Sequence, residues 1–308
     1  MEKVECFGQP DCLKLTNGTV EVVVTTAVGP RIARYGFVGG PNVLGETPDA
    51  GLTTGLGEWK AYGGHRLWAA PEKNPRTYVP DNSPVETEEL GERSVRLVRP
   101  IEEPTGLQKE MTVTLDSDGT GVAVEHTITN CGLWEIELAP WGLTILNGEA
   151  GGTVVIPQEP YISHDDELLP ARPMVLWHYT DLSDPRWTLG KTFIRLKVDA
   201  SLAEPQKVGV ADKQGWAAYA PGGPGGLLFV KVFDYVDGAV YPDDGCNCET
   251  YTAGSFVELE TLGPMHRLEP GDAAEHSERW QLFNDVTLGE SDDEVDAALR
   301  PVLGAEQA

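Results

Sequence analysis

Two glutamates stand two residues apart near the C-terminal end of the chain, in the segment Phe256–Leu262. This segment is typical of a β-strand, in which every second side chain lies on the same face. Glu258 and Glu260 would then be neighbours about 7 Å apart, among apolar residues. Repulsion and burial both raise the pKa of a carboxyl toward the range of a general acid or base. The alternative is a structural salt bridge to Lys231 or to an arginine.

The stretch from residue 44 to residue 82 is rich in side chains that suit a sugar. It shows no strand alternation, so we expect a long loop, and such loops in compact domains are usually functional. Flat aromatic faces pack against the C–H surfaces of a sugar, and planar polar groups hydrogen-bond its hydroxyls. The alternative is a packed loop in which Arg66 pairs with Glu58 or Glu72. We predict a site formed by Trp59, His65, Arg66, Trp68, Tyr78, Asp81 and Asn82.

Other candidates rest on single positions in predicted strands or turns. Lys231 lies between two phenylalanines on one strand face, as a buried ion-pair partner or as a substrate contact. Trp177 and Tyr179 could line a cleft or cover the core. His126 alternates with valines and an isoleucine, which favours a hydrogen-bonded core residue over a ligand.

We predict neither a metal nor a cofactor. The acidic clusters at residues 165–167 and 243–244 do not match a calcium-binding loop, which favours plain surface charge. The five cysteines have the spacing of neither a zinc site nor a disulfide framework. Free thiols in a cytoplasmic protein are the simplest interpretation.

Strand-like alternation dominates the rest of the chain. Residues 108–115 and 121–129, for example, read as strands joined by a turn at Asp116–Gly119. About a dozen such segments exceed what one open sheet comfortably holds. We therefore predict an all-β fold of two packed antiparallel sheets, as one domain spanning residues 1–308.

One helix is predicted, near the C-terminal end. Ser291 and Glu294 form a capping-box pattern before an apolar run, and Pro301 is expected to stop the helix.

The charge balance excludes some classes of partner. The chain has 23 basic and 49 acidic residues, for a formal net charge of −26. Nucleic-acid binding needs a basic surface, and an anionic membrane would repel this one. No segment approaches the ~20 apolar residues of a membrane helix, and the first ten residues lack the apolar core of a signal peptide.

Four stretches together resemble the galactose mutarotase-like superfamily, which includes the aldose 1-epimerases, and they resemble most closely a branch without a settled function. They are residues 17–36, residues 62–72, residues 124–130 with Gly132, and residues 259–271 followed by 278–280. The resemblance implies a large two-sheet supersandwich. It also implies chemistry that interconverts sugar anomers: a carboxylate takes the proton of the anomeric hydroxyl while an acid protonates the ring oxygen.

The resemblance assigns roles to particular residues. The family carboxylate lies in a Leu-Glu-Thr-Gln-like stretch, which matches Leu259–Leu262, so Glu260 inherits the role of base. His65 loosely resembles the sugar-binding histidine region, and Arg66 or Arg31 could replace the family arginine. The family's usual acid, a histidine after an Asn-x-Gly turn, is missing from the stretch that contains Trp141.

The expected function is therefore an aldose 1-epimerase-like reaction on a small sugar or oligosaccharide. Glu260 would act as base, Glu258 as its partner and His65 as acid or sugar contact. One alternative is a non-catalytic carbohydrate-binding module. Another is a glycoside hydrolase or polysaccharide lyase, which would need a second carboxyl or a Tyr or His partner across the cleft.

Overall fold

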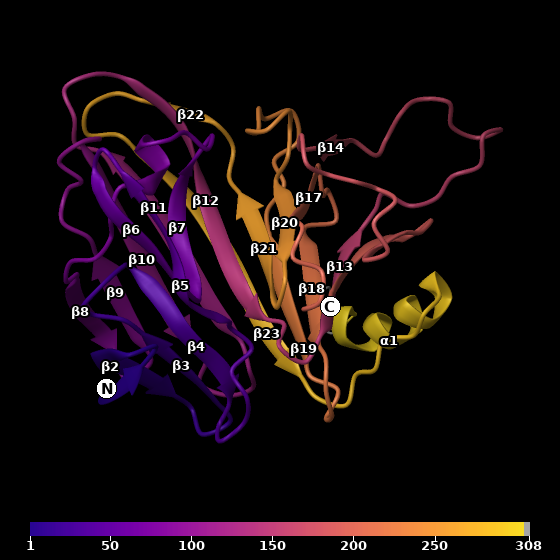
Figure 1. The fold of residues 1–308 in the computed structure, drawn as a ribbon, viewed down its shortest axis with the longest axis horizontal. Helices are drawn as coiled ribbons and strands as arrows, with labels where there is room; N and C mark the ends of the chain where they lie inside the picture. Colours follow the sequence, from indigo (N-terminus) through magenta and orange to yellow (C-terminus); the bar gives the residue numbers. More distant parts are fainter. Residues whose placement is uncertain (305–308) are drawn as a thin grey trace.

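The computed structural model describes residues 1–304 as two large antiparallel sheets packed face to face (Figure 1). One sheet has 11 strands and the other has 10. A separate two-stranded ribbon is formed by β5 (Glu46–Thr54) and β6 (Gly57–Gly63). The predicted all-β supersandwich is confirmed.

The 11-stranded sheet carries the candidate site. In spatial order it contains β1 (Glu2–Cys6), β2 (Gln9–Thr16), β3 (Val20–Val24), β4 (Arg31–Phe37), β7 (His65–Ala70), β12 (Ile136–Asn147), β21 (Phe256–Leu262), β20 (Cys248–Ala253), β17 (Gln206–Val210) and β14 (Met174–Leu176), with β22 (His266–Leu268) beside β12.

The 10-stranded sheet covers the other side of the core. In spatial order it contains β15 (Trp187–Leu189), β16 (Phe193–Val198), β13 (Gly152–Pro157), β18 (Trp216–Pro221), β19 (Leu228–Phe233), β23 (Ala273–Phe283), β11 (Val122–Asn130), β10 (Leu107–Leu115), β9 (Ser94–Val98) and β8 (Glu86–Gly91).

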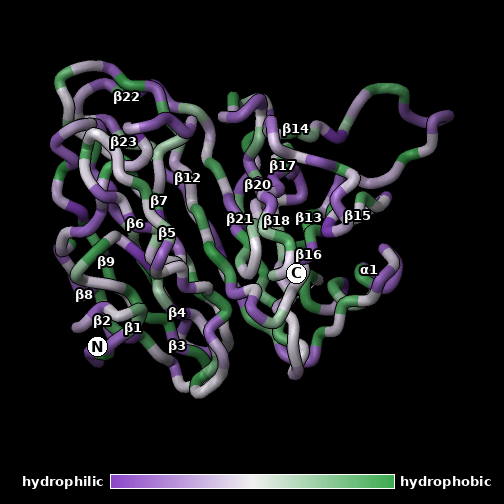
Figure 2. Tube along the Cα trace, viewed as in Figure 1, coloured by the Kyte–Doolittle hydropathy of each residue, from purple (hydrophilic) through white to green (hydrophobic). Residues whose placement is uncertain are grey.

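The main hydrophobic core lies between the two sheets. Many strands alternate between hydrophobic and hydrophilic residues along the chain trace (Figure 2), because one face of each strand is buried there. Tyr35 of the first sheet contacts Phe229 and Trp280 of the second, with ring centroids 6.2 and 5.9 Å away. These aromatic contacts help to join the two layers.

The prediction of a long loop over residues 44–82 is wrong. This stretch contains β5, β6, β7 and a short 3₁₀ turn at Arg76–Tyr78. All six residues of β7 are buried, so the strand lacks the alternation that would identify it. It is buried on both faces because one side packs in the core and the other under the site described below.

The C-terminal helix α1 (Asp292–Leu303) begins with the predicted capping box between Ser291 and Glu294. Pro301 does not stop the helix, which continues to Leu303. A proline in the last turn removes only one hydrogen bond, so its cost is smaller there than in a helix interior. Among residues 1–304, no helix is both long and apolar enough to cross a membrane.

Candidate functional site

Strands β7, β12, β21, β20 and β17 lie next to one another in the 11-stranded sheet (Figure 1). Their outward side chains form rows across the sheet. Residues that pair across antiparallel strands lie on the same face. One row consists of Arg66, Leu143, Glu260 and Glu249, and the next consists of Ile145, Glu258, Tyr251 and Lys207.

This face forms the floor of a cavity of about 430 Å³. Aromatic side chains contribute much of its wall: the rings of Trp59, Trp68 and Tyr78 contact one another, with centroid distances of 5.2–5.4 Å. Further along the sheet, Trp141 contacts Trp68 at 5.2 Å. The lining residues are Thr47, Ala50, Trp59, Ala61, Arg66, Trp68, Glu72, Tyr78, Trp141, Leu143, Ile145, Trp177, Tyr179, Pro205, Lys207, Tyr251, Phe256 and Glu258.

Arg66 is held in place by the aromatic wall. Its guanidinium carbon lies 4.2 Å from the ring centroid of Trp68 and 4.8 Å from that of Trp59. Burial lowers the pKa of Arg66 to about 10, with a further contribution from Arg31, so the group remains charged at neutral pH. Its Nη2 lies 3.9 Å from Oε1 of Glu258, which places a cation beside that carboxyl.

Glu258 is the carboxyl of the predicted pair that lines the cavity. Burial raises its pKa to about 7, and the neighbouring Glu260 raises it further while Arg66 opposes the shift. A carboxyl with such a pKa can both accept and return a proton near neutral pH. The register of β21 confirms the prediction that the pair shares one strand face, and the direction of the Glu258 pKa agrees with the expected shift.

Glu260 lies deeper, fully buried below the cavity. Its Oε2 accepts hydrogen bonds from Nε1 of Trp141 and from Nζ of Lys207, both at 2.9 Å. The same ammonium lies 2.8 Å from Oε2 of Glu249. An ammonium has three N–H donors and the hydrogen bond to Glu260 uses one of them, so a donor remains for a ligand in the cavity that Lys207 lines.

The two carboxylates of this group stabilise the charge of Lys207 but repel each other. Although burial alone would lower it, the pKa of Lys207 is raised well above its usual value because Glu260 and Glu249 surround the ammonium. Burial raises the pKa of Glu249; Lys207 opposes that shift, whereas Glu260 adds to it. Lys207 therefore remains a cation at neutral pH, between the rings of Trp141 and Trp177.

The prediction that His65 belongs to the sugar site is wrong. His65 and Arg66 are adjacent in β7, so their side chains lie on opposite faces of the sheet. Arg66 lines the cavity, whereas His65 is fully buried between the two sheets. Lys231 also lies between the two sheets. It is therefore a buried ion-pair partner and not a substrate contact, with Nζ 3.0 Å from Oε1 of Glu278.

The interior histidines form an ordered hydrogen-bond chain. Nδ1 of His126 lies 2.9 Å from the carbonyl of His276, and a carbonyl can only accept, so this nitrogen carries the proton. The free Nε2 of His126 then accepts from Nε2 of His65 at 2.7 Å. Nδ1 of His65 must in turn accept from the hydroxyl of Thr144 at 2.8 Å. That hydroxyl accepts from Lys231 at 2.6 Å, so each donor in the chain meets one acceptor.

The same side chains include three with the geometry of a metal-ligand set. Ligand atoms of His65, His126 and Glu278 lie within 4.8 Å of one another. The hydrogen bonds described above already account for all the close contacts of the His65 and His126 ring nitrogens, so these contacts do not require a metal ion. Glu278 is already neutralised by Lys231 and accepts a hydrogen bond from Nε1 of Trp280 at 2.7 Å.

We expect these interior histidines to stay neutral in mildly acidic solution. Burial lowers the pKa of His65, His126 and His276, the last to about 3. Long-range ¹H–¹⁵N spectra of histidine-labelled protein should show three signals that do not titrate between pH 8 and 5, with His126 in the Nδ1–H form. The exposed His164 supplies the reference signal. If the signals of these three histidines shift with a midpoint near pH 6.5, the proposed order of hydrogen bonds is wrong.

Arg31, Asp81 and Asn82 do not line the cavity. Nη2 of Arg31 lies 2.9 Å from Oδ2 of Asp81, and its Nη1 donates to the carbonyl of Ala61 at 2.9 Å. Asn82 donates to the carbonyl of Glu58 at 2.7 Å. The prediction of direct sugar contacts is therefore wrong for these three, whose bonds instead hold the β5–β6 ribbon over the sheet.

The remaining predicted residues meet at the cavity: Trp59, Arg66, Trp68, Tyr78, Trp141, Trp177, Tyr179 and Glu258 line it, and Glu260 lies beneath. Two participants were missed, Lys207 and Glu249. Glu249 follows Cys248 in a buried strand, and a charged residue in such a strand is an available signal. Lys207 carries no comparable signal, because only the pairing of β17 with β20 brings it to Glu260.

Comparison with known proteins supports the fold. No protein-family model matches the sequence, and no curated protein matches it either. Among solved structures, the proposed mutarotase YeaD of Salmonella typhimurium is similar, with a TM-score of 0.60 at 11% identity, covering 92% of this chain and 93% of that one. A galactose mutarotase-like protein of Lactobacillus casei has a TM-score of 0.52 at 10% identity, covering 88% and 100%.

This chain has the galactose mutarotase-like fold. A third structure agrees, a proposed aldose 1-epimerase of Klebsiella pneumoniae, with a TM-score of 0.56 at 11% identity, covering 94% of this chain and 81% of that one. At such low identities, similarity concerns the architecture of a mutarotase-like protein. The chemistry has to be argued from the side chains of this chain.

Proposed function

We propose that this mutarotase-like protein binds a reducing sugar in the 430 Å³ cavity and interconverts its anomers, with Glu258 as the base. The observation that carries the proposal is a cavity-lining carboxyl whose pKa is raised to about 7, chiefly by burial. The aromatic wall around Trp68 suits the C–H face of a sugar ring. The volume falls within the range of about 300–1,000 Å³ that is typical of small-molecule sites.

The proposed reaction moves two protons. The carboxylate of Glu258 takes the proton of the anomeric hydroxyl, and a carbonyl forms at that carbon as its bond to the ring oxygen breaks. Lys207 passes a proton to the ring oxygen as negative charge develops on that oxygen, although Glu260 and Glu249 raise the pKa of the ammonium and so make it a weaker acid than a free lysine. The carbon–carbon bond rotates, and the reverse transfers close the ring as the other anomer and restore both groups.

Glu258 is a better candidate for the base than Glu260, although the resemblance assigns that role to Glu260. Oε2 of Glu260 already accepts two hydrogen bonds, and the side chain does not line the cavity. Its proposed role is to position Lys207. The ammonium of Lys207 replaces the histidine acid that is missing from the stretch containing Trp141.

Polarimetry on fresh α-anomers of several aldoses tests this function, and its pH dependence tests the base. The reactive form of Glu258 is the carboxylate, and a pKa of about 7 leaves only about 1% of it ionised at pH 5. The catalysed rate, after subtraction of the spontaneous rate, should therefore rise with pH between 5 and 8 and then level off. A flat profile across this range would exclude Glu258 as base.

A second candidate is a sugar-binding protein without catalysis. Among the residues that line the cavity, none is a histidine, so the usual acid of this chemistry is absent there. Binding of a sugar measured by calorimetry, with no acceleration in the polarimeter, would select this alternative.

A further inference from the structure

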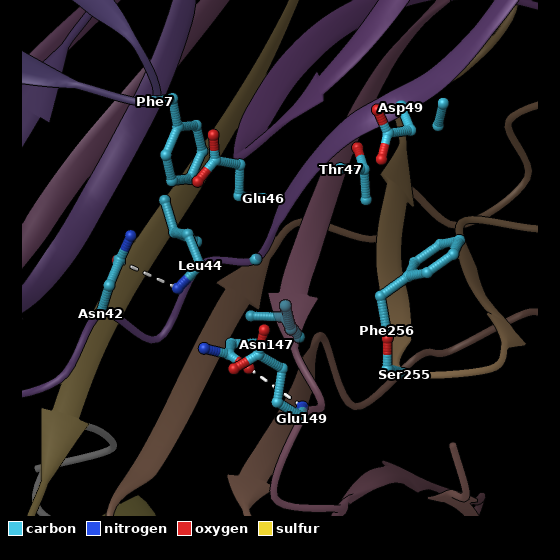
Figure 3. A pocket seen from close by; sticks show the side chains of 13 residues that line it. Phe7, Asn42, Leu44, Glu46, Thr47, Asp49, Asn147, Glu149, Ser255 and Phe256 are labelled. Carbon is cyan, nitrogen blue, oxygen red and sulfur yellow. Dashed lines mark hydrogen bonds between the residues drawn. The ribbon is translucent and has the colours of Figure 1, made fainter. Parts of the chain in front are cut away.

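A second cavity has a volume of about 470 Å³, and Figure 3 shows the residues that line it. It is formed where β12 ends and β21 begins, with Asn147 and Phe256 on its walls. Phe7, from the turn between β1 and β2, lines it as well. Nothing in the proposed reaction uses this space.

The two cavities share Thr47, Ala50 and Phe256 in their linings, so they adjoin each other. Their junction lies at an irregularity of the β5–β6 ribbon. Thr47 pairs with Tyr62 and Gly51 with Lys60, so three residues of β5 oppose a single residue of β6. The hydroxyl oxygen of Thr47 is buried there without a hydrogen-bond partner, which leaves a polar atom for a ligand that spans the junction.

The side chains of the second cavity suit another sugar ring. Phe7 and Phe256 offer apolar surface for C–H faces. The carboxylates of Glu46, Asp49 and Glu149 are hydrogen-bond acceptors, which match the hydroxyls of a sugar. No lysine or arginine is present in its lining, so an anionic ring would meet only repulsion.

We propose that this second cavity is a subsite for an uncharged sugar ring, and that the ligand is a neutral oligosaccharide whose reducing end lies beside Glu258. The proposal rests on the proposed function, because the first cavity must hold the reducing sugar. Each cavity is large enough for a small ligand, and the junction at Thr47 lets one chain of rings occupy both.

Calorimetry with matched neutral sugars tests the subsite. The probes are glucose, galactose and xylose, each compared with a β-1,4-linked disaccharide of the same sugar: cellobiose, galactobiose and xylobiose. At least one disaccharide should bind about tenfold more tightly than its monosaccharide. Ser255→Trp fills the second cavity from an exposed turn and should remove that gain without changing the monosaccharide affinity. Ser117→Trp, in an exposed turn elsewhere, should change neither affinity.

The outcomes separate the two proposals. If each disaccharide binds no more tightly than its monosaccharide, or if Ser255→Trp leaves the gain intact, the subsite is overturned while the proposed function stands. If none of the six sugars binds, both proposals fail.

Discussion

Glu258→Gln should lower the catalysed rate of anomer interconversion by about 100-fold or more at pH 8, the usual range for losing a general base. Glutamine keeps the shape of the side chain and its place beside Arg66, but it cannot take up the hydroxyl proton. Sugar affinity should change little, because the aromatic wall remains. Polarimetry of the variant and calorimetry with the same sugar measure the two effects separately.

Two matched variants make this test specific. Glu260→Gln should reduce the rate less, because it weakens the hold on Lys207 and leaves the base intact. Glu275→Gln makes the same chemical change at an exposed position of β23 and should have no effect. If Glu260→Gln lowers the rate more than Glu258→Gln, then Glu260 is the base and Glu258 is not.

Lys231→Met should destabilise the fold by about 3–5 kcal/mol, the usual cost of breaking a buried ion pair from one side. The ammonium is fully buried and donates to Glu278 at 3.0 Å, to Thr144 at 2.6 Å and to the carbonyl of Leu259 at 3.2 Å. Its removal leaves the carboxylate of Glu278 without a counter-charge in the core. Urea unfolding followed by tryptophan fluorescence measures the loss.

The reason for this expectation can itself be tested. Lys231→Met combined with Glu278→Gln removes both charges and should recover most of the lost stability, because no unpaired charge remains buried. Lys197→Met breaks the exposed pair with Glu290 and should cost only about 1 kcal/mol or less. Equal losses for the two single variants would show that burial does not set the cost at Lys231.

Local pattern predicted much of the architecture. The two strands at 108–115 and 121–129 pair as β10 and β11, as their alternation and turn indicate. The helix begins at the capping box because Ser291 and Glu294 satisfy its first backbone donors locally. Within the stretch at 44–82, β7 shows no alternation because it is buried on both faces.

Local pattern also predicted part of the candidate site. Strand periodicity alone placed Glu258 and Glu260 on one face, since neighbours two apart always share it. Periodicity also requires His65 and Arg66 to lie on opposite faces, but it does not say which of them meets the cavity. The packing of β7 against the second sheet decides which residue faces the cavity. His65 faces the core, where it is hydrogen-bonded to His126 of the second sheet.

Lys207 shows what only the tertiary structure decided. It lies 53 residues from Glu260 along the chain, and the two meet because β17, β20 and β21 pair side by side. The sequence by itself therefore determined that two acidic groups share a strand face and that an aromatic segment precedes them. Long-range strand pairing decided which cation they meet, because the partner of a charge is set by spatial neighbours that no local pattern records.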